Sequence, residues 1–113
     1  METLNIVAAL AALAQETRLA IFKLLVQVGN EGLPAGRISE ITGIAPSSLS
    51  FHLKEMTHAR MLRARQEGRF MIYSANYDSM NSLLAYLTEN CCAGAPCHTF
   101  TGCKPDKGLM PTE

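Results

Sequence analysis

Four cysteines near the C-terminal end of the chain have the clearest capacity for chemistry. Cys91 and Cys92 are adjacent, Cys97 follows five residues later, and Cys103 follows six residues after that. Thiolates are soft ligands and select soft metal or metalloid ions. Trivalent arsenic, for example, takes three thiolates in a pyramidal arrangement. Adjacent cysteines do not readily close a relaxed disulfide, because the shared peptide strains the ring, but both can face one bound ion.

Other roles for these thiols remain open from the sequence. Zinc or cadmium prefers four ligands, and His98 or Cys103 is available as the fourth. The thiols also fit a redox sensor, in which oxidation is the signal. A fourth interpretation is that the cysteines are incidental to function.

Length and charge limit the class of protein. The chain has 113 residues and no formal net charge, which predicts one domain that is marginal at burying its own surface and would gain from dimerisation. Residues 34–75 contain six Lys or Arg against three Glu, so this segment carries +3. A basic segment inside a neutral chain indicates a local electrostatic contact with a polyanion.

The N-terminus shows no signal-peptide pattern. Its apolar run follows Glu2 and is too short to span a bilayer. We therefore expect a cytoplasmic protein with no membrane partner, whose cysteines are kept reduced.

The element on which the rest of the chain depends is a helix predicted over residues 45–60. Pro46 suits a first helical position, where its missing N–H costs nothing. One face is a narrow apolar stripe made by Leu49, Leu53 and Met56. The opposite face carries small polar, aromatic and basic side chains, namely Ser47, Ser50, Phe51, Lys54 and His58. Such an acid-poor front is suited to the major groove of DNA.

The remaining pattern predicts a mainly α chain with a β-hairpin, in the order α-α-α-α-β-β-α. Helices are expected over 4–14, 15–28, 34–42 and 77–90, and a hairpin over 61–75 that turns at Glu67-Gly68. Gly43 stops the short helix before the central one, which is the helix-turn-helix pattern with a following wing. Residues 1–90 form the folded domain in this interpretation, and residues 91–113 form a flexible tail that contains the cysteines.

Three separated segments carry a family resemblance. Residues 13–25 (LAQETRLAIFKLL), 48–53 (SLSFHL) and 67–73 (EGRFMIY) together resemble the ArsR/SmtB family of winged-helix metalloregulatory repressors. The resemblance covers roughly residues 4–90. It implies a homodimer that binds an imperfect palindrome in double-stranded operator DNA and is released by an inducer.

Two departures from the family pattern bear on the sensing site. The arsenic-binding cysteine motif of some members has no counterpart in residues 37–42, and the Asp/His zinc pattern is absent because Asp78 is followed by no histidine until His98. Other members have a Cys-Cys pair after the last helix and a third cysteine nearby. The resemblance therefore implies As(III), or Sb(III), as inducer at Cys91, Cys92 and Cys97, with Cys103 as a possible replacement and no organic cofactor. A repressor that responds to zinc, cadmium or thiol oxidation is the alternative.

The expected DNA contacts lie on the central helix and the hairpin: Ser47, Ser48, Ser50, Phe51, His52, Lys54, Arg65 and Arg69. The serines suit base edges or phosphates, and the basic residues suit phosphates, which position a protein without reading sequence. Phe51 suits a thymine methyl group, or else folds back on the preceding helix. His52 is interpreted as a packed or phosphate-bonding histidine.

The first helix is apolar on two sides, which predicts a second subunit as its outer cover. Its stripes are Leu4, Val7, Ala8 and Ala11 on one side, and Ile6, Leu10 and Leu13 on the other. We expect the first and last helices to form the dimer interface through Leu4, Val7, Ala11, Leu83 and Leu87. The two central helices would then enter successive major grooves about 34 Å apart.

No enzyme is expected. The chain has no glycine-rich phosphate loop, and its acidic residues are scattered. A cysteine pair at a helix C-terminus also faces the wrong end of the helix dipole to bind an anionic substrate. A small metal-buffering module without a DNA target is a competing class, against which the basic hairpin argues.

Overall fold

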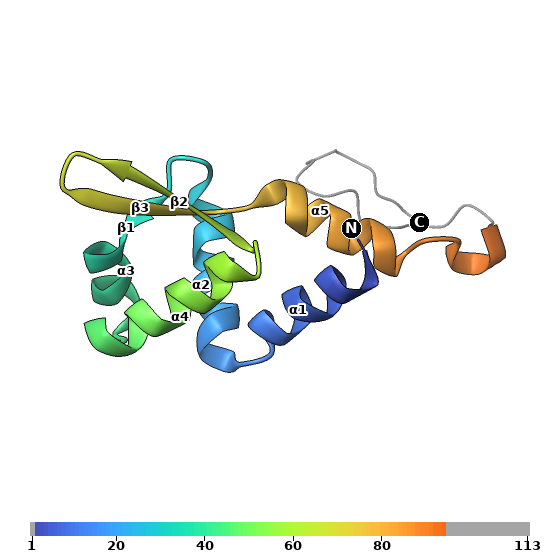
Figure 1. The fold of residues 1–113 in the computed structure, drawn as a ribbon, viewed down its shortest axis with the longest axis horizontal. Helices are drawn as coiled ribbons and strands as arrows, with labels where there is room; N and C mark the ends of the chain where they lie inside the picture. The colour runs from blue at the N-terminus through green and yellow to red at the C-terminus, as the bar shows by residue number, and fades with distance from the viewer. Residues whose placement is uncertain (1, 95–113) are drawn as a thin grey trace.

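A computed structural model describes residues 2–94 and shows five α-helices around a small sheet. The elements are α1 (Thr3–Leu13), α2 (Glu16–Val28), β1 (Leu33–Pro34), α3 (Ala35–Thr42), α4 (Pro46–His58), β2 (Leu62–Glu67), β3 (Phe70–Ala75), α5 (Tyr77–Leu87) and a 3₁₀ turn (Cys91–Gly94). Figure 1 shows α2, α3 and α4 under the sheet, whereas α1 and α5 lie together at the other end. This arrangement is a winged helix-turn-helix fold, as the sequence predicts.

The core is formed by the apolar stripes of the helices. In α4, Leu49, Leu53 and Met56 are buried, which confirms the predicted inward face. They meet Ile21 and Leu25 of α2 in one cluster. Burial of these side chains is the main force that holds the helices together, since each contributes about 1.5–3 kcal/mol relative to exposure.

The turn between α3 and α4 is set by local chemistry. Gly43 ends α3 in the left-handed conformation with φ of 76°, which glycine adopts without a steric penalty. The Ser39 hydroxyl donates to the carbonyl oxygen of Ile44 at 2.6 Å, and the Thr42 hydroxyl donates to that of Ile38 at 2.7 Å. The bond from Ser39 spans the turn and links the end of α3 to the segment that leads into α4.

The sheet has one more strand than the predicted hairpin. Its order is β1-β3-β2, and Leu33 and Pro34 of β1 pair antiparallel with Tyr73 and Ile72 of β3. A two-residue strand that ends in proline carries no periodic signal, which explains why the sequence pattern missed it. The prediction that a helix begins at Pro34 is therefore wrong: Pro34 belongs to β1, and α3 begins at Ala35.

Other predicted helix ends also differ. The central helix ends at His58 rather than Arg60, because Arg60 takes a positive φ of 65°. The last helix ends at Leu87 rather than at residue 90, and Asn90 likewise has a positive φ of 56°. The predicted division of the chain at residue 90 stays a prediction, because most of residues 91–113 lie outside the described part.

The burial of α1 corrects part of its predicted pattern. Its inward face is made by Ile6, Ala9 and Ala12, whereas Leu10 is exposed although it was placed in the same stripe as Ile6.

Leu83 of α5 was expected in the dimer interface, but its side chain is only 6% exposed and belongs to the core of the single chain. Leu83 is buried because α5 folds back over the core after the sheet, so that this face of the helix packs inward.

No single helix in residues 2–94 is long and apolar enough to cross a membrane. The α1 and α2 pair passes the same length and composition criteria only when taken together, across a bend of 101°.

Candidate nucleic-acid interface

The outer face of α4 is open and carries no acidic side chain in its first two turns. Ser47, Ser48, Ser50 and Lys54 are exposed, as the sequence predicts for this face. Ala45 precedes the helix and forms no side-chain cap. The first amide groups of α4 thus have no side-chain acceptor at the cap position, and such N–H groups are suited to phosphate oxygens.

Phe51 and His52 of α4 are held by a residue that the sequence analysis did not single out as a site. Arg18 of α2 donates from Nε to Nδ1 of His52 at 3.0 Å. Its guanidinium carbon also lies 5.7 Å from the centre of the Phe51 ring. Phe51 remains 57% exposed, so its ring is not folded into the core.

No local signal in the sequence marks Arg18 as part of this face. It stands 34 positions before His52, in the first turn of a different helix. Only the packing of α2 against α4 brings the two side chains together.

The hairpin carries two predicted DNA-contact arginines, Arg65 and Arg69, which differ in their contacts within the chain. Arg65 donates to the backbone carbonyl oxygens of Asn30 and Glu31 at 3.2 and 2.7 Å, and to the Glu67 carboxylate at 2.7 Å. These bonds tie the wing to the loop after α2. Arg69 is exposed beside the turn of the hairpin. The proposed phosphate contacts of both residues stay predictions.

Ion pairs determine which positive charges are free for a partner. Within residues 2–94, Arg37 pairs with Glu40, Arg63 with Asp78 and Arg65 with Glu67, all at exposed positions where each pair contributes little to stability. Lys54 and Arg69 form no ion pair within the same part of the chain. Lys54 on α4 and Arg69 at the hairpin turn are thus two positive charges that remain available for a partner.

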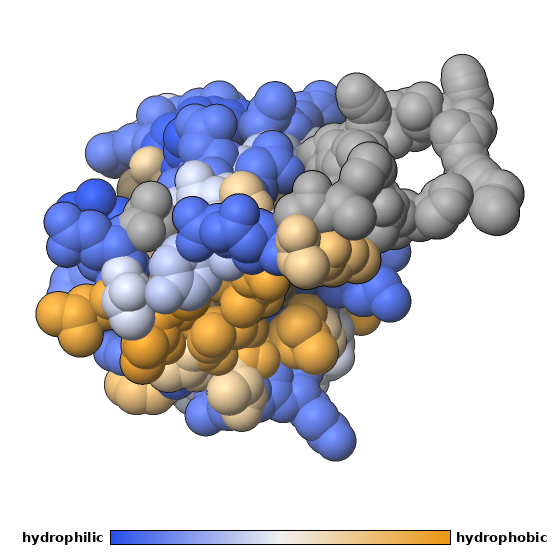
Figure 2. Space-filling view, turned by 90° about the vertical axis from the view of Figure 1, so that its right-hand side faces the viewer, coloured by the Kyte–Doolittle hydropathy of each residue, from blue (hydrophilic) through white to orange (hydrophobic). Residues whose placement is uncertain are grey.

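An apolar patch lies at the end of the molecule formed by α1 and α5. Leu4 is 80% exposed, Val7 is 55% exposed and Leu87 is 56% exposed, and Ala11 and Leu10 are exposed beside them. Figure 2 looks onto this end and shows a continuous hydrophobic area. We call the residues Leu4, Val7, Leu10, Ala11 and Leu87 the α1/α5 patch. Contiguous apolar surface of this kind marks an interaction site.

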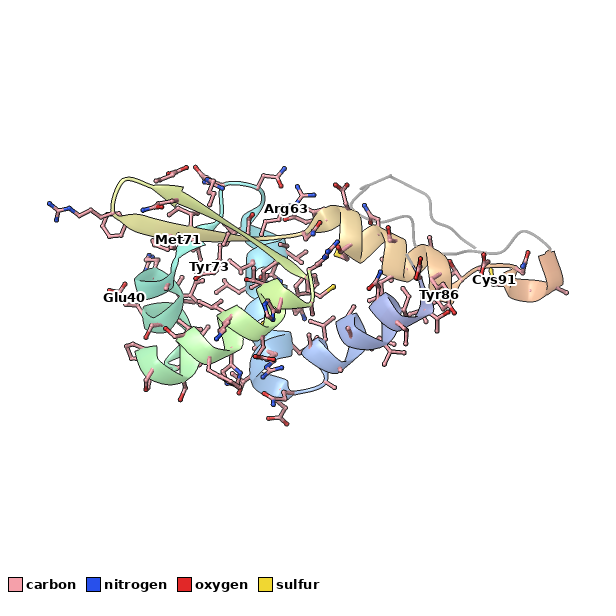
Figure 3. All side chains as sticks on the ribbon, in the orientation of Figure 1. Glu40, Arg63, Met71, Tyr73, Tyr86 and Cys91 are labelled. Atoms are coloured by element: carbon pink, nitrogen blue, oxygen red, sulfur yellow. The ribbon has the colours of Figure 1, made fainter. Side chains whose placement is uncertain are left out.

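The two described cysteines follow α5 directly. Cys91 is half-buried and Cys92 is exposed with φ of 57°, which turns the chain sharply at the thiol pair. Figure 3 places Cys91 beyond the end of α5, at the opposite end of the molecule from Met71 in the wing. Cys97, His98 and Cys103 lie outside the described residues. Within residues 2–94 no three His, Cys, Asp or Glu side chains come together as a metal site. The described part thus supplies two adjacent soft donors.

Hydrogen bonds connect the start of α5 to the end of α4 and to α2. Asn76 donates from Nδ2 to the carbonyl oxygen of Arg60 at 2.9 Å, and its Oδ1 accepts from the Ser79 amide at 3.2 Å. The Tyr77 hydroxyl donates to the carbonyl oxygen of Val26 at 2.7 Å. At the other end of α5, the hydroxyls of Tyr86 and Thr3 lie 3.0 Å apart. These bonds tie the start of α5 to the end of α2 and to the segment after α4, and its last turn to the start of α1.

Comparison with known proteins agrees with this architecture. Residues 13–65 match the family described as "Helix-turn-helix domain", which agrees with the winged helix-turn-helix fold of the chain. Among curated proteins, it is 29% identical over 85 residues to the HTH-type transcriptional regulator YgaV of Escherichia coli K12, with 75% of this chain and 84% of YgaV covered.

Solved structures share the fold. The crystal structure of NolR from Sinorhizobium fredii is 28% identical, with a TM-score of 0.61 over 75% of this chain and 82% of NolR. A second solved structure, that of Mb0332 from Mycobacterium bovis, is described as a homodimeric winged helix-turn-helix DNA-binding domain and a possible ArsR-family regulator. It is 23% identical, with a TM-score of 0.62 over 83% of this chain and 87% of that one. YgaV is named a transcriptional regulator and Mb0332 is described as a possible one, which agrees with the expectation that the chain is no enzyme.

Proposed function

We propose that the chain is a homodimeric transcriptional repressor of the ArsR type that binds operator DNA through α4 and the wing. The observation that carries this proposal is the acid-poor outer face of α4, flanked by the uncompensated charges of Lys54 and Arg69. Uncompensated basic groups bind phosphates, and small polar side chains on a helix can approach base edges. The naming of YgaV as a transcriptional regulator supports the same role.

The α1/α5 patch is the surface through which two copies associate. Its exposed apolar side chains lie at the end of the molecule away from the wing, so that both wings stay free in a dimer (Figure 1). The description of Mb0332 as homodimeric supports this assembly. A two-fold axis at this patch would place the two α4 helices in successive major grooves of an imperfect palindrome, about 34 Å apart.

Release from DNA is proposed to follow binding of As(III), or Sb(III), to Cys91, Cys92 and a third thiol from Cys97 or Cys103. The two described thiols are adjacent and follow the helix that touches α1 through Tyr86 and Thr3. Drawing a third thiol toward them restrains the end of α5. The Asn76 and Tyr77 bonds connect the other end of α5 to the recognition half of the chain. Such coupling between two sites is typically about 1–3 kcal/mol.

The test is a DNA-release titration with the full chain in its reduced state. An operator selected from a random library is labelled, and binding is followed by fluorescence anisotropy during addition of arsenite, antimonite, zinc, cadmium or peroxide. We expect arsenite and antimonite to lower DNA affinity about 5- to 150-fold. Selective release by zinc or cadmium, or by peroxide with reversal by thiol, would replace the inducer proposal with the corresponding alternative.

Serine variants identify the ligands. The triple variant Cys91→Ser, Cys92→Ser, Cys97→Ser should bind DNA normally and ignore arsenite, whereas Cys103→Ser alone should respond like the natural chain. A triple variant that still releases DNA with arsenite would show that the inducer site is elsewhere. If instead Cys103→Ser alone abolishes the response, Cys103 rather than Cys97 is the third ligand.

A further inference from the structure

Arg18 makes the polar contact that joins α2 to the DNA-facing side of α4. Its Nε donates to His52 Nδ1 at 3.0 Å, and its guanidinium lies over the Phe51 ring at 5.7 Å. The Phe51 and His52 rings also meet edge to face, with centroids 6.1 Å apart and planes at 63°. One residue of α2 thus contacts two consecutive side chains of the recognition helix.

The direction of the Arg18 hydrogen bond determines which nitrogen of the His52 ring accepts and which one can donate. An arginine Nε–H only donates, so Nδ1 of His52 accepts and carries no proton. A doubly protonated imidazole has no acceptor nitrogen and could not make this contact. While this contact is made, Nε2 is therefore the ring nitrogen that carries a proton and can donate. No residue in the described part of the chain pairs with that Nε2–H.

We propose that Arg18 is a positioning residue for sequence recognition, which presents His52 Nε2–H as a donor to a base edge and holds Phe51 beside it. This inference rests on the proposed DNA-binding function and deepens it. The acceptors that suit such a donor are N7 and O6 of guanine or O4 of thymine in the major groove. The Phe51 ring suits an adjacent apolar group such as a thymine methyl.

Holding both side chains before DNA binds improves affinity without a new contact to DNA. Each side chain that is ordered only on binding costs about 2- to 13-fold in affinity. The positive charge of Arg18 is a separate contribution, since Lys54 and Arg69 already supply charge on this side of the molecule. The positioning role therefore predicts a loss of sequence preference rather than a uniform loss of attraction to DNA.

The experiment is a double-mutant cycle on the full chain, read out on a selected operator and on all its single base-pair variants. Arg18→Met keeps the length of the side chain but removes the donor and the charge. Arg18→Lys keeps the charge but lacks the Nε–H. We expect both to lower consensus affinity about 5- to 20-fold and to relax the preference at the base pair that His52→Ala also relaxes. When either Arg18 substitution is combined with His52→Ala, the preference at that base pair should not fall below the value for His52→Ala alone.

His52→Gln separates positioning from stability. Glutamine keeps an amide donor near the place of Nε2 but offers no acceptor at the place of Nδ1. We expect it to retain part of the base preference and to become insensitive to Arg18→Met, which a merely structural arginine would not produce. Thermal unfolding of each variant is measured in parallel.

Three outcomes would overturn the inference. Equal loss of affinity for all sequences, with a smaller salt dependence for Arg18→Met only, would make Arg18 a phosphate contact. A lower melting temperature with unchanged base preference would make it a structural brace. Additive effects of the Arg18 and His52 substitutions would show that the residues act independently. If the natural chain selects no DNA sequence at all, the proposed function is overturned as well. If the natural chain selects a sequence but the Arg18 and His52 substitutions show no coupling, only this inference is overturned.

Discussion

At the scale of single residues, the packing of the sheet depends on the absence of a side chain at Gly32. This glycine has φ of 70°, and a Cβ added to it would lie 2.5 Å from the backbone carbonyl oxygen of Tyr73 in β3. Both the positive φ and the close approach exclude other residues. Gly32 is thus the reason why β1 can pair with β3 directly after the loop that Arg65 holds.

We expect Gly32→Ala to lower the free energy of unfolding by about 2–4 kcal/mol, because it adds backbone strain and a clash with β3. Urea denaturation followed by circular dichroism measures the loss. Gly36→Ala is the matched control: Gly36 lies in α3 with nothing within 4 Å of an added Cβ, so alanine there should be neutral or stabilising by up to about 1 kcal/mol. Equal stability of the two variants would show that β1 does not need this glycine.

At the scale of elements, α5 is the helix that joins the two ends of the molecule. It begins at Asn76, whose side chain caps the helix and also bonds to the Arg60 carbonyl at the end of the recognition half. Its inner face is buried through Ser79 and Leu83, and its last turn touches α1. A change in the position of α5 therefore has a direct structural path to both the proposed dimer surface and the segment that follows α4.

We expect Asn76→Ala to lower the free energy of unfolding by about 1–2 kcal/mol, because it removes the helix cap and leaves the Arg60 carbonyl without its side-chain donor. Asn76→Asp keeps a capping acceptor and should lose less stability. In both variants arsenite should still bind but release DNA less completely, if α5 transmits the signal through this bond. Thermal unfolding and the anisotropy titration measure the two effects, and full release by both variants would remove Asn76 from the path.

At the scale of the whole molecule, apolar and charged surfaces are segregated. The α1/α5 patch lies at one end of the molecule (Figure 2). Lys54 belongs to α4 and Arg69 to the turn of the wing, and both elements extend toward the other end (Figure 1). A protein whose charge is zero overall can bind a polyanion through unpaired positive groups on one part of its surface. Dimerisation through the opposite end would double that surface.

The variant Leu4→Glu, Val7→Glu should be a folded monomer, because two carboxylates would have to be buried in the dimer without partners. Sedimentation velocity gives the oligomeric state, and circular dichroism checks the fold. Phe70→Glu is the control, since the exposure of Phe70 lies between those of Leu4 and Val7 but Phe70 belongs to the wing. It should remain dimeric. A double variant that stays dimeric would exclude the α1/α5 patch as the interface.

Helices, their inward faces and the helix-turn-helix were predictable from the sequence, because these features depend on neighbours within one or two helical turns. The stripe of Leu49, Leu53 and Met56 and the stop at Gly43 are examples. The α4 serines were predictable as an exposed face for the same reason. Strand β1 was not predictable, because two residues pair with β3 only through a contact across almost forty positions of the chain.

Local patterns in the sequence were enough to predict the order of the five helices and the hairpin, the apolar periodicity that builds the core, and the soft donors after the last helix. Only the packed structure shows that Leu83 lies in the core of the chain, that Arg65 holds the wing to the loop after α2, and that Arg18 contacts α4. Periodicity reports which face of an element is apolar, but not which neighbour covers that face. Contacts between side chains far apart in the chain exist only once the elements have packed, so composition and spacing cannot contain them.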